Sequence, residues 1–67
     1  MNKLIDFIEE KHKEDVELFL KSEYSVHYGW TIRVFKKGYD TPIIEAHDND
    51  YDKVTNMCYK MLKNAEV

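Results

Sequence analysis

The sequence predicts a single α+β domain over residues 1–67, with a small antiparallel sheet as one layer and an N-terminal and a C-terminal helix as the other. Three observations indicate this fold class. Apolar residues recur every three to four positions near both ends, they alternate with polar residues in the middle, and Gly, Asp and Pro mark the changes of period. A chain of 67 residues, 43% of them hydrophobic, suffices for one core and not for two.

The first element is expected to be a helix over residues 3–22. Its apolar residues recur on one face, which consists of Leu4, Ile5, Ile8, His12, Val16, Phe19 and Leu20. Phe7 and Leu18 lie on a flank of this face. Packing against the sheet edge is the simplest role for this pair, and exposure to solvent or contact with a partner are the alternatives.

Residues 24–36 alternate with a period of two and predict a strand. One face carries Val26, Tyr28, Trp30, Ile32 and Val34, and the other carries His27, Gly29, Thr31, Arg33 and Phe35. Gly38 and Asp40 then mark a turn, and residues 42–47 predict a shorter strand with Ile44 and Ala46 facing inward. The long strand either breaks near Gly29, giving the order α-β-β-β-α, or overhangs, giving α-β-β-α. Since an unpaired edge invites another chain, a homodimer is one expected assembly.

The last helix is expected over residues 50–64. Its apolar face consists of Tyr51, Val54, Cys58, Met61, Leu62 and Ala65. Asp48, Asn49 and Asp50 are residue types that cap a helix N-terminus. Asp48, Asp50 and Asp52 also have the spacing of an EF-hand loop, but that loop requires Gly at position 53, which is Lys, and Glu at position 59, which is Tyr. We therefore predict capping and no metal site.

The sequence offers no catalytic or cofactor motif. It has no Gly-rich phosphate loop, its three histidines lack metal-ligand spacing, and Cys58 falls on the apolar face of its helix. We therefore expect a protein that is not an enzyme and binds no cofactor. A single cysteine indicates a reducing compartment, and the chain has no long apolar run or signal-peptide pattern, so a soluble cytoplasmic protein without membrane contact is expected.

Two surfaces are candidates for binding. The first is acidic and comprises Asp40, Glu45, Asp48, Asn49, Asp50 and Asp52, with Tyr39 and Tyr51 beside them. It is expected to engage a basic surface on a host protein. The second is a basic strand face that comprises His27, Thr31, Arg33, Phe35, Lys36 and Lys37.

The basic strand face suits a dimeric nucleic-acid-binding or antitoxin-like regulator, because stacking aromatics and cations recognise single strands. The net charge of −3 opposes direct nucleic-acid binding, which depends on neutralising phosphates. The acidic surface is therefore the preferred site. A structural or assembly subunit is the remaining alternative.

Three families share features with this chain. The order α-β-β-β-α resembles double-stranded RNA-binding domains, but acids stand at residues 48–52, where that family places lysines. Residues 30–63 resemble HicB-type antitoxins without their Pro-x-x-x-Gly turn or their DNA-binding segment.

The chain also contains, in order, a short N-terminal helix, Tyr24-x-Val26, Ile32-Arg33-Val34 followed by Gly38, and Ile44-Glu45 leading through acids into a helix that ends Lys63-Asn64. This series resembles small anti-CRISPR proteins of Gram-positive prophages, which inhibit the type II CRISPR nuclease. This resemblance implies an acidic mimic of DNA, with the acidic residues named above in that role. The further acidic helical segment of that family does not follow within residues 1–67.

Overall fold

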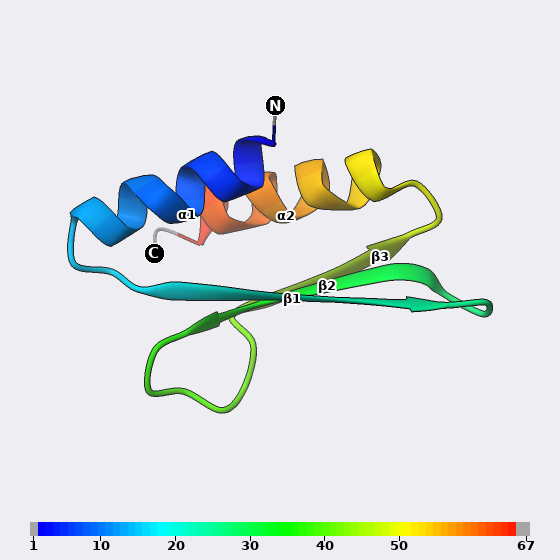
Figure 1. Ribbon diagram of the computed structural model, residues 1–67, viewed down its shortest axis with the longest axis horizontal. Helices are drawn as coiled ribbons and strands as arrows, with labels where there is room; N and C mark the ends of the chain where they lie inside the picture. The colour runs from blue at the N-terminus through cyan, green and yellow to red at the C-terminus, as the bar shows by residue number, and fades with distance from the viewer. Residues whose placement is uncertain (1, 66–67) are drawn as a thin grey trace.

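The computed structural model describes residues 2–65 as two layers. The elements are α1 (Lys3–Lys13), β1 (Leu18–Ser25), β2 (Gly29–Lys36), β3 (Ile44–Asp48) and α2 (Tyr51–Asn64). The strands form an antiparallel sheet in the order β1-β2-β3, and both helices lie on one face of it (Figure 1). The α+β class is confirmed, and of the two predicted orders the structure has α-β-β-β-α. We refer to the face without helices as the open face.

The first helix is shorter than the sequence predicted. It starts at the N-cap Asn2, whose side-chain oxygen accepts hydrogen bonds from the backbone N–H groups of Leu4 and Ile5. It ends at Lys13, and Asp15 has the left-handed φ of 63°. The prediction of a helix over residues 3–22 is therefore wrong in its second half.

Strand β1 replaces the missing half of that helix. It pairs with β2 along its whole length, from Leu18 opposite Lys36 to Ser25 opposite Gly29. This pairing satisfies backbone groups of β2 that a helix would leave without partners. Helix propensities differ by only tenths of a kcal/mol per residue, so the long-range pairing prevails.

Residues 24–36 do not form one continuous strand: the chain turns at residues 26–28, so the break near Gly29 is the alternative that the structure has. The Ser25 hydroxyl oxygen accepts hydrogen bonds from the N–H groups of His27 at 3.1 Å and Tyr28 at 3.4 Å. Val26 and Tyr28, expected to face inward, are instead exposed, Val26 to 90%. His27, expected on the open face, lies in the same turn.

Gly29 closes this turn and brings it against the other end of the chain. It has a φ of +73°, and a Cβ atom there would lie 2.8 Å from Asn49 Cα and 2.9 Å from the Asp48 carbonyl oxygen. Only glycine tolerates this positive φ and also lacks the Cβ atom for which there is no space. The β1–β2 turn is therefore packed directly on the connection between β3 and α2.

The predicted strand–turn–strand unit around Gly38 and Asp40 is confirmed with shifted bounds. Ile32 pairs with Ala46 and Val34 pairs with Ile44, and all four side chains are buried as the alternation predicted. The strand predicted over residues 42–47 runs over Ile44–Asp48. The turn at Gly38 is at the end of the sheet opposite to the β1–β2 turn.

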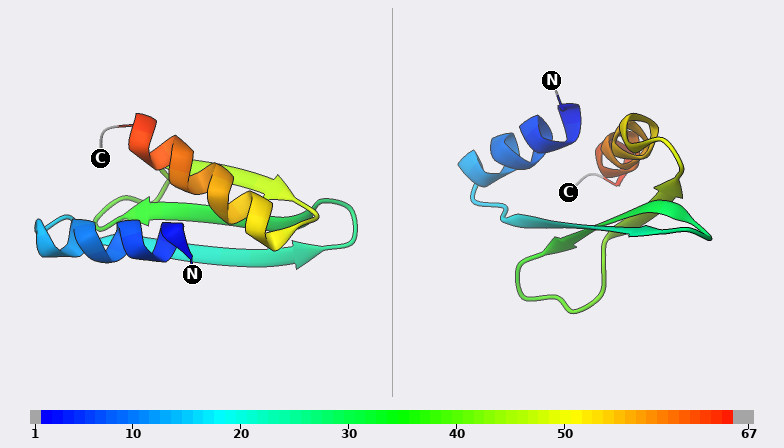
Figure 2. Two further views of the ribbon diagram at one scale, coloured as in Figure 1. Left: turned by 90° about the horizontal axis from the view of Figure 1, so that it is seen from above. Right: turned by 45° about the vertical axis from the view of Figure 1, so that its right-hand side comes forward.

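The core lies between the helices and the sheet (Figure 2). It contains Leu4, Leu18, Ile32, Val34, Ile44, Ala46, Val54, Cys58 and Leu62. Leu18, predicted on a helix flank, is part of this core, whereas Phe19, predicted on the core face, is 46% exposed. Phe7 packs edge-to-face on Tyr59 of α2 at 5.9 Å instead of on the sheet edge.

Helix α2 agrees with its prediction in position and cap. Asp50 is the N-cap, and its side-chain oxygen accepts hydrogen bonds from the N–H groups of Asp52 at 2.9 Å and Lys53 at 3.3 Å. Its buried apolar residues include Val54, Cys58 and Leu62, whereas Tyr51, Met61 and Ala65 lie at exposed margins. Within residues 2–65, neither helix is long and apolar enough to cross a membrane.

Candidate binding surfaces

The structure separates the predicted acidic residues into groups. Tyr39 and Asp40 lie in the β2–β3 loop, which hangs below the sheet on the left of Figure 1. Residues 48–52 lie at the opposite end of β3, and five strand residues at about 3.3 Å each put roughly 15 Å between the two ends. Glu45 lies between them on β3. The eight residues therefore do not form one continuous patch.

We call the group at the β3–α2 connection the acidic end. It comprises Tyr28, Asp48, Asn49, Asp50, Tyr51 and Asp52. Its backbone is fixed by a hydrogen bond from the Asp50 N–H to the Asp48 carboxylate at 2.8 Å, followed by the Asp50 cap. In the part of the chain that the structure describes, none of the three Asp carboxylates forms an ion pair. The acidic end therefore combines fixed geometry with uncompensated negative charge.

Aromatic side chains flank these carboxylates. Tyr28 is 65% exposed, and its ring centroid lies 5.9 Å from that of His47 on β3. On the helix side of the sheet, Trp30 packs edge-to-face on Tyr51 with centroids 4.9 Å apart. Sequence reasoning missed Tyr28 because it placed that residue inside a strand. The usable signal was a Ser and a Gly bracketing three residues, a common turn pattern.

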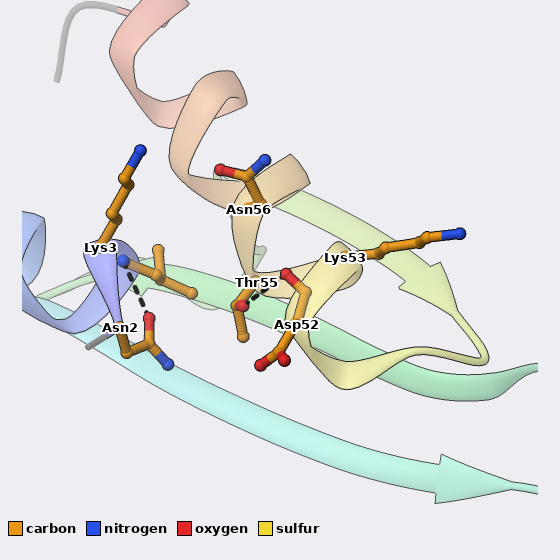
Figure 3. A pocket seen from close by; sticks show the side chains of 7 residues that line it. Asn2, Lys3, Asp52, Lys53, Thr55 and Asn56 are labelled. Atoms are coloured by element: carbon orange, nitrogen blue, oxygen red, sulfur yellow. Dashed lines mark hydrogen bonds between the residues drawn. The ribbon is translucent and has the colours of Figure 1, made fainter.

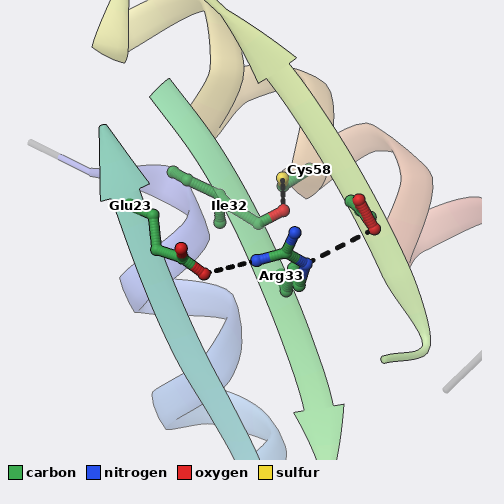
Figure 4. A network of polar contacts seen from close by, with 5 residues as sticks. Glu23, Ile32, Arg33 and Cys58 are labelled. Carbon is green, nitrogen blue, oxygen red and sulfur yellow. Dashed lines mark hydrogen bonds and ion pairs between the residues drawn. The ribbon is translucent and has the colours of Figure 1, made fainter. Parts of the chain in front are cut away.

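The predicted basic strand face is electrically compensated. Thr31, Arg33 and Phe35 do share the open face of β2, as predicted. Arg33 Nη1 pairs with Glu23 on β1, and Arg33 Nε lies 3.4 Å from a Glu45 carboxylate oxygen on β3 (Figure 4). The guanidinium group is thus held between two carboxylates.

The other members of that set are dispersed. Lys36 ends β2, and Lys37 in the following turn forms an ion pair with Glu17 at 3.2 Å. His27 lies in the turn at the other end of the sheet. Sequence reasoning did not foresee this compensation, because it placed Glu17 and Glu23 off the sheet.

A hollow of about 630 Å³ lies between the first turns of α1 and α2 (Figure 3). Its polar groups already serve the helix ends: Asn2 caps α1, and the Thr55 hydroxyl donates to the Asp52 carbonyl oxygen at 2.9 Å. Figure 3 shows the Lys53 side chain extending away from α1. The hollow does not bring a nucleophile and a base together.

Cys58 is a core residue. Its thiol is fully buried, and Sγ lies 3.9 Å from the Ile32 carbonyl oxygen, its hydrogen-bond acceptor (Figure 4). Burial raises the pKa of the Cys58 thiol from 9.0 to about 11. The group is therefore a thiol at neutral pH, and the nucleophilic form is the thiolate. Among residues 2–65, no three His, Cys, Asp or Glu side chains converge as metal ligands.

The chain matches no protein-family model, and comparisons with curated proteins and with solved structures find no match. The resemblance to anti-CRISPR proteins therefore stays a prediction.

Proposed function

We propose that this domain is a small non-catalytic binding protein whose acidic end occupies a basic surface of a nucleic-acid-handling protein. The observation that carries the proposal is the set of three unpaired carboxylates, Asp48, Asp50 and Asp52, beside an exposed tyrosine. Carboxylates at a fixed spacing can replace phosphates opposite Lys and Arg, and they steer association with a basic partner.

The aromatic residues supply what charge alone lacks. Tyr is enriched among the residues that carry interface binding energy, because its ring buries area while its hydroxyl keeps a hydrogen-bonding partner. Tyr28 is already positioned by the Ser25 hydrogen bonds and the ring of His47. Little conformational freedom is then lost on binding.

The nucleic-acid-binding alternative receives less support. Arg33 is held between Glu23 and Glu45, and Lys37 is paired with Glu17. Phosphates would have to displace carboxylates that are already in place. At the acidic end, by contrast, three carboxylates have no ion-pair partner among residues 2–65.

The anti-CRISPR resemblance supplies the first partner to test, a type II CRISPR nuclease loaded with its guide RNA, and with it a cytoplasmic site of action. Duplex DNA binding by the nuclease is measured by fluorescence anisotropy with increasing amounts of this protein. The test variant is Asp48→Asn/Asp50→Asn/Asp52→Asn, which removes three charges and keeps the oxygens that cap α2, since Asn and Asp cap equally well. The control Glu9→Gln/Asp15→Asn/Asp40→Asn removes the same charge elsewhere.

We expect the wild type and the control to compete with DNA and the test variant to compete about tenfold less well, because three charge contacts are lost. The matched pair Tyr28→Ala and Tyr39→Ala tests the aromatic anchor, since the two rings are exposed to 65% and 64% at opposite ends of the sheet. Only Tyr28→Ala should weaken competition. If both charge variants competed like the wild type, or the wild type did not compete, this proposal for the acidic end would be wrong.

A further inference from the structure

Strand β1 has a free edge along its full length. It is the outer strand in the order β1-β2-β3, and Figure 2 (left) shows α1 above its first part and no element of residues 2–65 along its outer side. The Lys37 N–H donates to the Glu17 carbonyl oxygen. In an antiparallel pair every second residue bonds to the neighbouring strand, so this bond shows which residues of β1 do so. The odd-numbered residues of β1 therefore bond to β2, and the N–H and C=O groups of Leu18, Leu20, Ser22 and Tyr24 point outward.

This edge has little of the usual protection against pairing. Natural edges are short, bulged, or carry Pro, Lys or inward-pointing charges, and of these devices β1 has Lys21 alone. β1 has eight residues and a regular register with β2, whereas β3 at the other edge has five. An antiparallel strand can therefore continue the sheet at β1.

The edge is complementary to a second copy of itself. If Ser22 of one chain lies opposite Ser22 of another, Leu20 lies opposite Tyr24 of the second copy. All these residues have backbone N–H and C=O groups that point to the free edge, so the two strands can form hydrogen bonds. On the open face Lys21 then faces Glu23 of the second copy, a carboxylate that also pairs with Arg33 of its own chain, and this contact occurs twice by symmetry. Two other registers also keep the helices of both chains on the same side of the sheet. One of them places Lys21 opposite Lys21 of the second copy, and the other places Glu23 opposite Glu23, so both bring like charges together.

The same register provides a contact for the most exposed apolar side chain. It brings the turn that carries Val26, which is 90% exposed, next to the Leu18 end of β1 in the second copy. Leu18 borders a groove of about 370 Å³ between α1 and the start of β1, whose apolar lining includes Ile8 and Phe19. Val26 of each chain would close the groove of the other.

We propose that the β1 edge pairs with β1 of a second copy, forming a homodimer with one continuous six-stranded antiparallel sheet. Ser22 lies on the two-fold axis. The acidic end lies at the β3–α2 connection and is not part of this contact.

The oligomeric state tests this proposal by sedimentation velocity from low micromolar to millimolar protein. The wild type should dimerise as concentration rises. Lys21→Glu and Glu23→Lys should each raise the dimer dissociation constant about tenfold, because two cross-strand pairs change from attractive to repulsive. An equimolar mixture of the two variants should form a heterodimer near the wild-type dissociation constant, because both cross-strand pairs of that heterodimer again join an acidic side chain to a basic one. Ser22→Lys should prevent pairing, and His47→Lys on β3 is its matched control.

Amide hydrogen exchange supplies a second measurement. The outward N–H groups of Leu20, Ser22 and Tyr24 should exchange more slowly at high protein concentration, whereas the N–H groups of Lys21 and Glu23 should not change. A wild type that stays monomeric at all these concentrations would overturn the proposal. So would a dimer that tolerates each single charge reversal or that the mixture does not restore. Circular dichroism of each variant excludes unfolding as the cause of a lost dimer.

Discussion

Gly29 joins the two segments that build the acidic end, and replacing it with Ala gives the most direct test of the fold. Its φ of +73° costs a non-glycine residue about 1–2 kcal/mol. The new Cβ would also lie 2.8 Å from Asn49 Cα and 2.9 Å from the Asp48 carbonyl oxygen, both backbone atoms, and such overpacking costs a further ~1–3 kcal/mol. Ala reduces the entropy of the unfolded chain, which offsets about 0.4–1 kcal/mol.

Gly38 is the matched control. Its φ is +91°, and a Cβ there would meet nothing within 4 Å, so Gly38→Ala carries the backbone strain without the contact. We expect Gly38→Ala to lower the free energy of unfolding by about 1 kcal/mol or less and Gly29→Ala by roughly 2–4 kcal/mol. A domain of this size has a total stability of roughly 3–10 kcal/mol, so Gly29→Ala removes a large part of it.

Urea denaturation measures both variants. Trp30 is the only tryptophan and packs on Tyr24 and Tyr51, so its fluorescence reports the end of the sheet that Gly29 closes. Circular dichroism reports the helices independently. If the two variants lost equal stability, the close approach of Gly29 to residues 48 and 49 would be refuted, and with it the joining of the β1–β2 turn to the acidic end.

Two further predictions concern α2. Asp50→Ala should lower the free energy of unfolding by about 1 kcal/mol and Asp50→Asn by much less, because Asn keeps the oxygen that accepts from the Asp52 and Lys53 N–H groups; equal losses in urea denaturation would contradict capping. The raised pKa of Cys58, about 11 against 9.0 when unfolded, stabilises the folded state fully below pH 9, and this contribution is lost as pH rises to 11 because the unfolded chain deprotonates first. Between pH 8 and pH 11 the free energy of unfolding of the wild type should therefore fall by about 2 kcal/mol more than that of Cys58→Ala. If the two free energies fell in parallel, this contribution of Cys58 would be refuted.

The sequence predicted those elements whose period and boundary signals agree. For α2, the capping Asp50 and the spacing of Val54, Cys58 and Leu62 indicate the same helix. The inward positions of Ile44 and Ala46 followed from alternation alone. At these places local preference and long-range packing point in the same direction.

Residues 16–22 were mispredicted because their pattern fits two structures. Val16, Leu20 and Phe19 match a helical stripe, and Leu18 with Leu20 also matches the period of a strand. The decision comes from β2, whose outer edge gains eight residue pairs only if this segment is extended. The stabilisation that comes from pairing with β2 cannot be read from the local sequence pattern of residues 16–22.

The candidate surface could be predicted in composition but not in arrangement. Asp48, Asp50 and Asp52 are close in sequence and stay together, while Asp40, eight residues before Asp48, lies at the other end of β3. Tyr28 joined the acids only because Gly29 packs on Asn49. Tyr28 and Asp48 are 20 positions apart, and their proximity depends on how the strands pair. The prediction of a helix up to residue 22 hid the pairing of β1 with β2.

The mispredicted segment also connects the two proposed surfaces. Because residues 18–25 form an edge strand, Glu23 is placed where it neutralises Arg33, whereas the three Asp carboxylates of the acidic end have no ion-pair partner among residues 2–65. The same strand leaves its outer backbone groups without partners along the opposite edge from β3. A two-fold axis through Ser22 would put the acidic ends of the two copies at opposite ends of the joined sheet. Ser22→Lys should therefore leave the intrinsic affinity of one acidic end unchanged and remove only the gain from two-site binding.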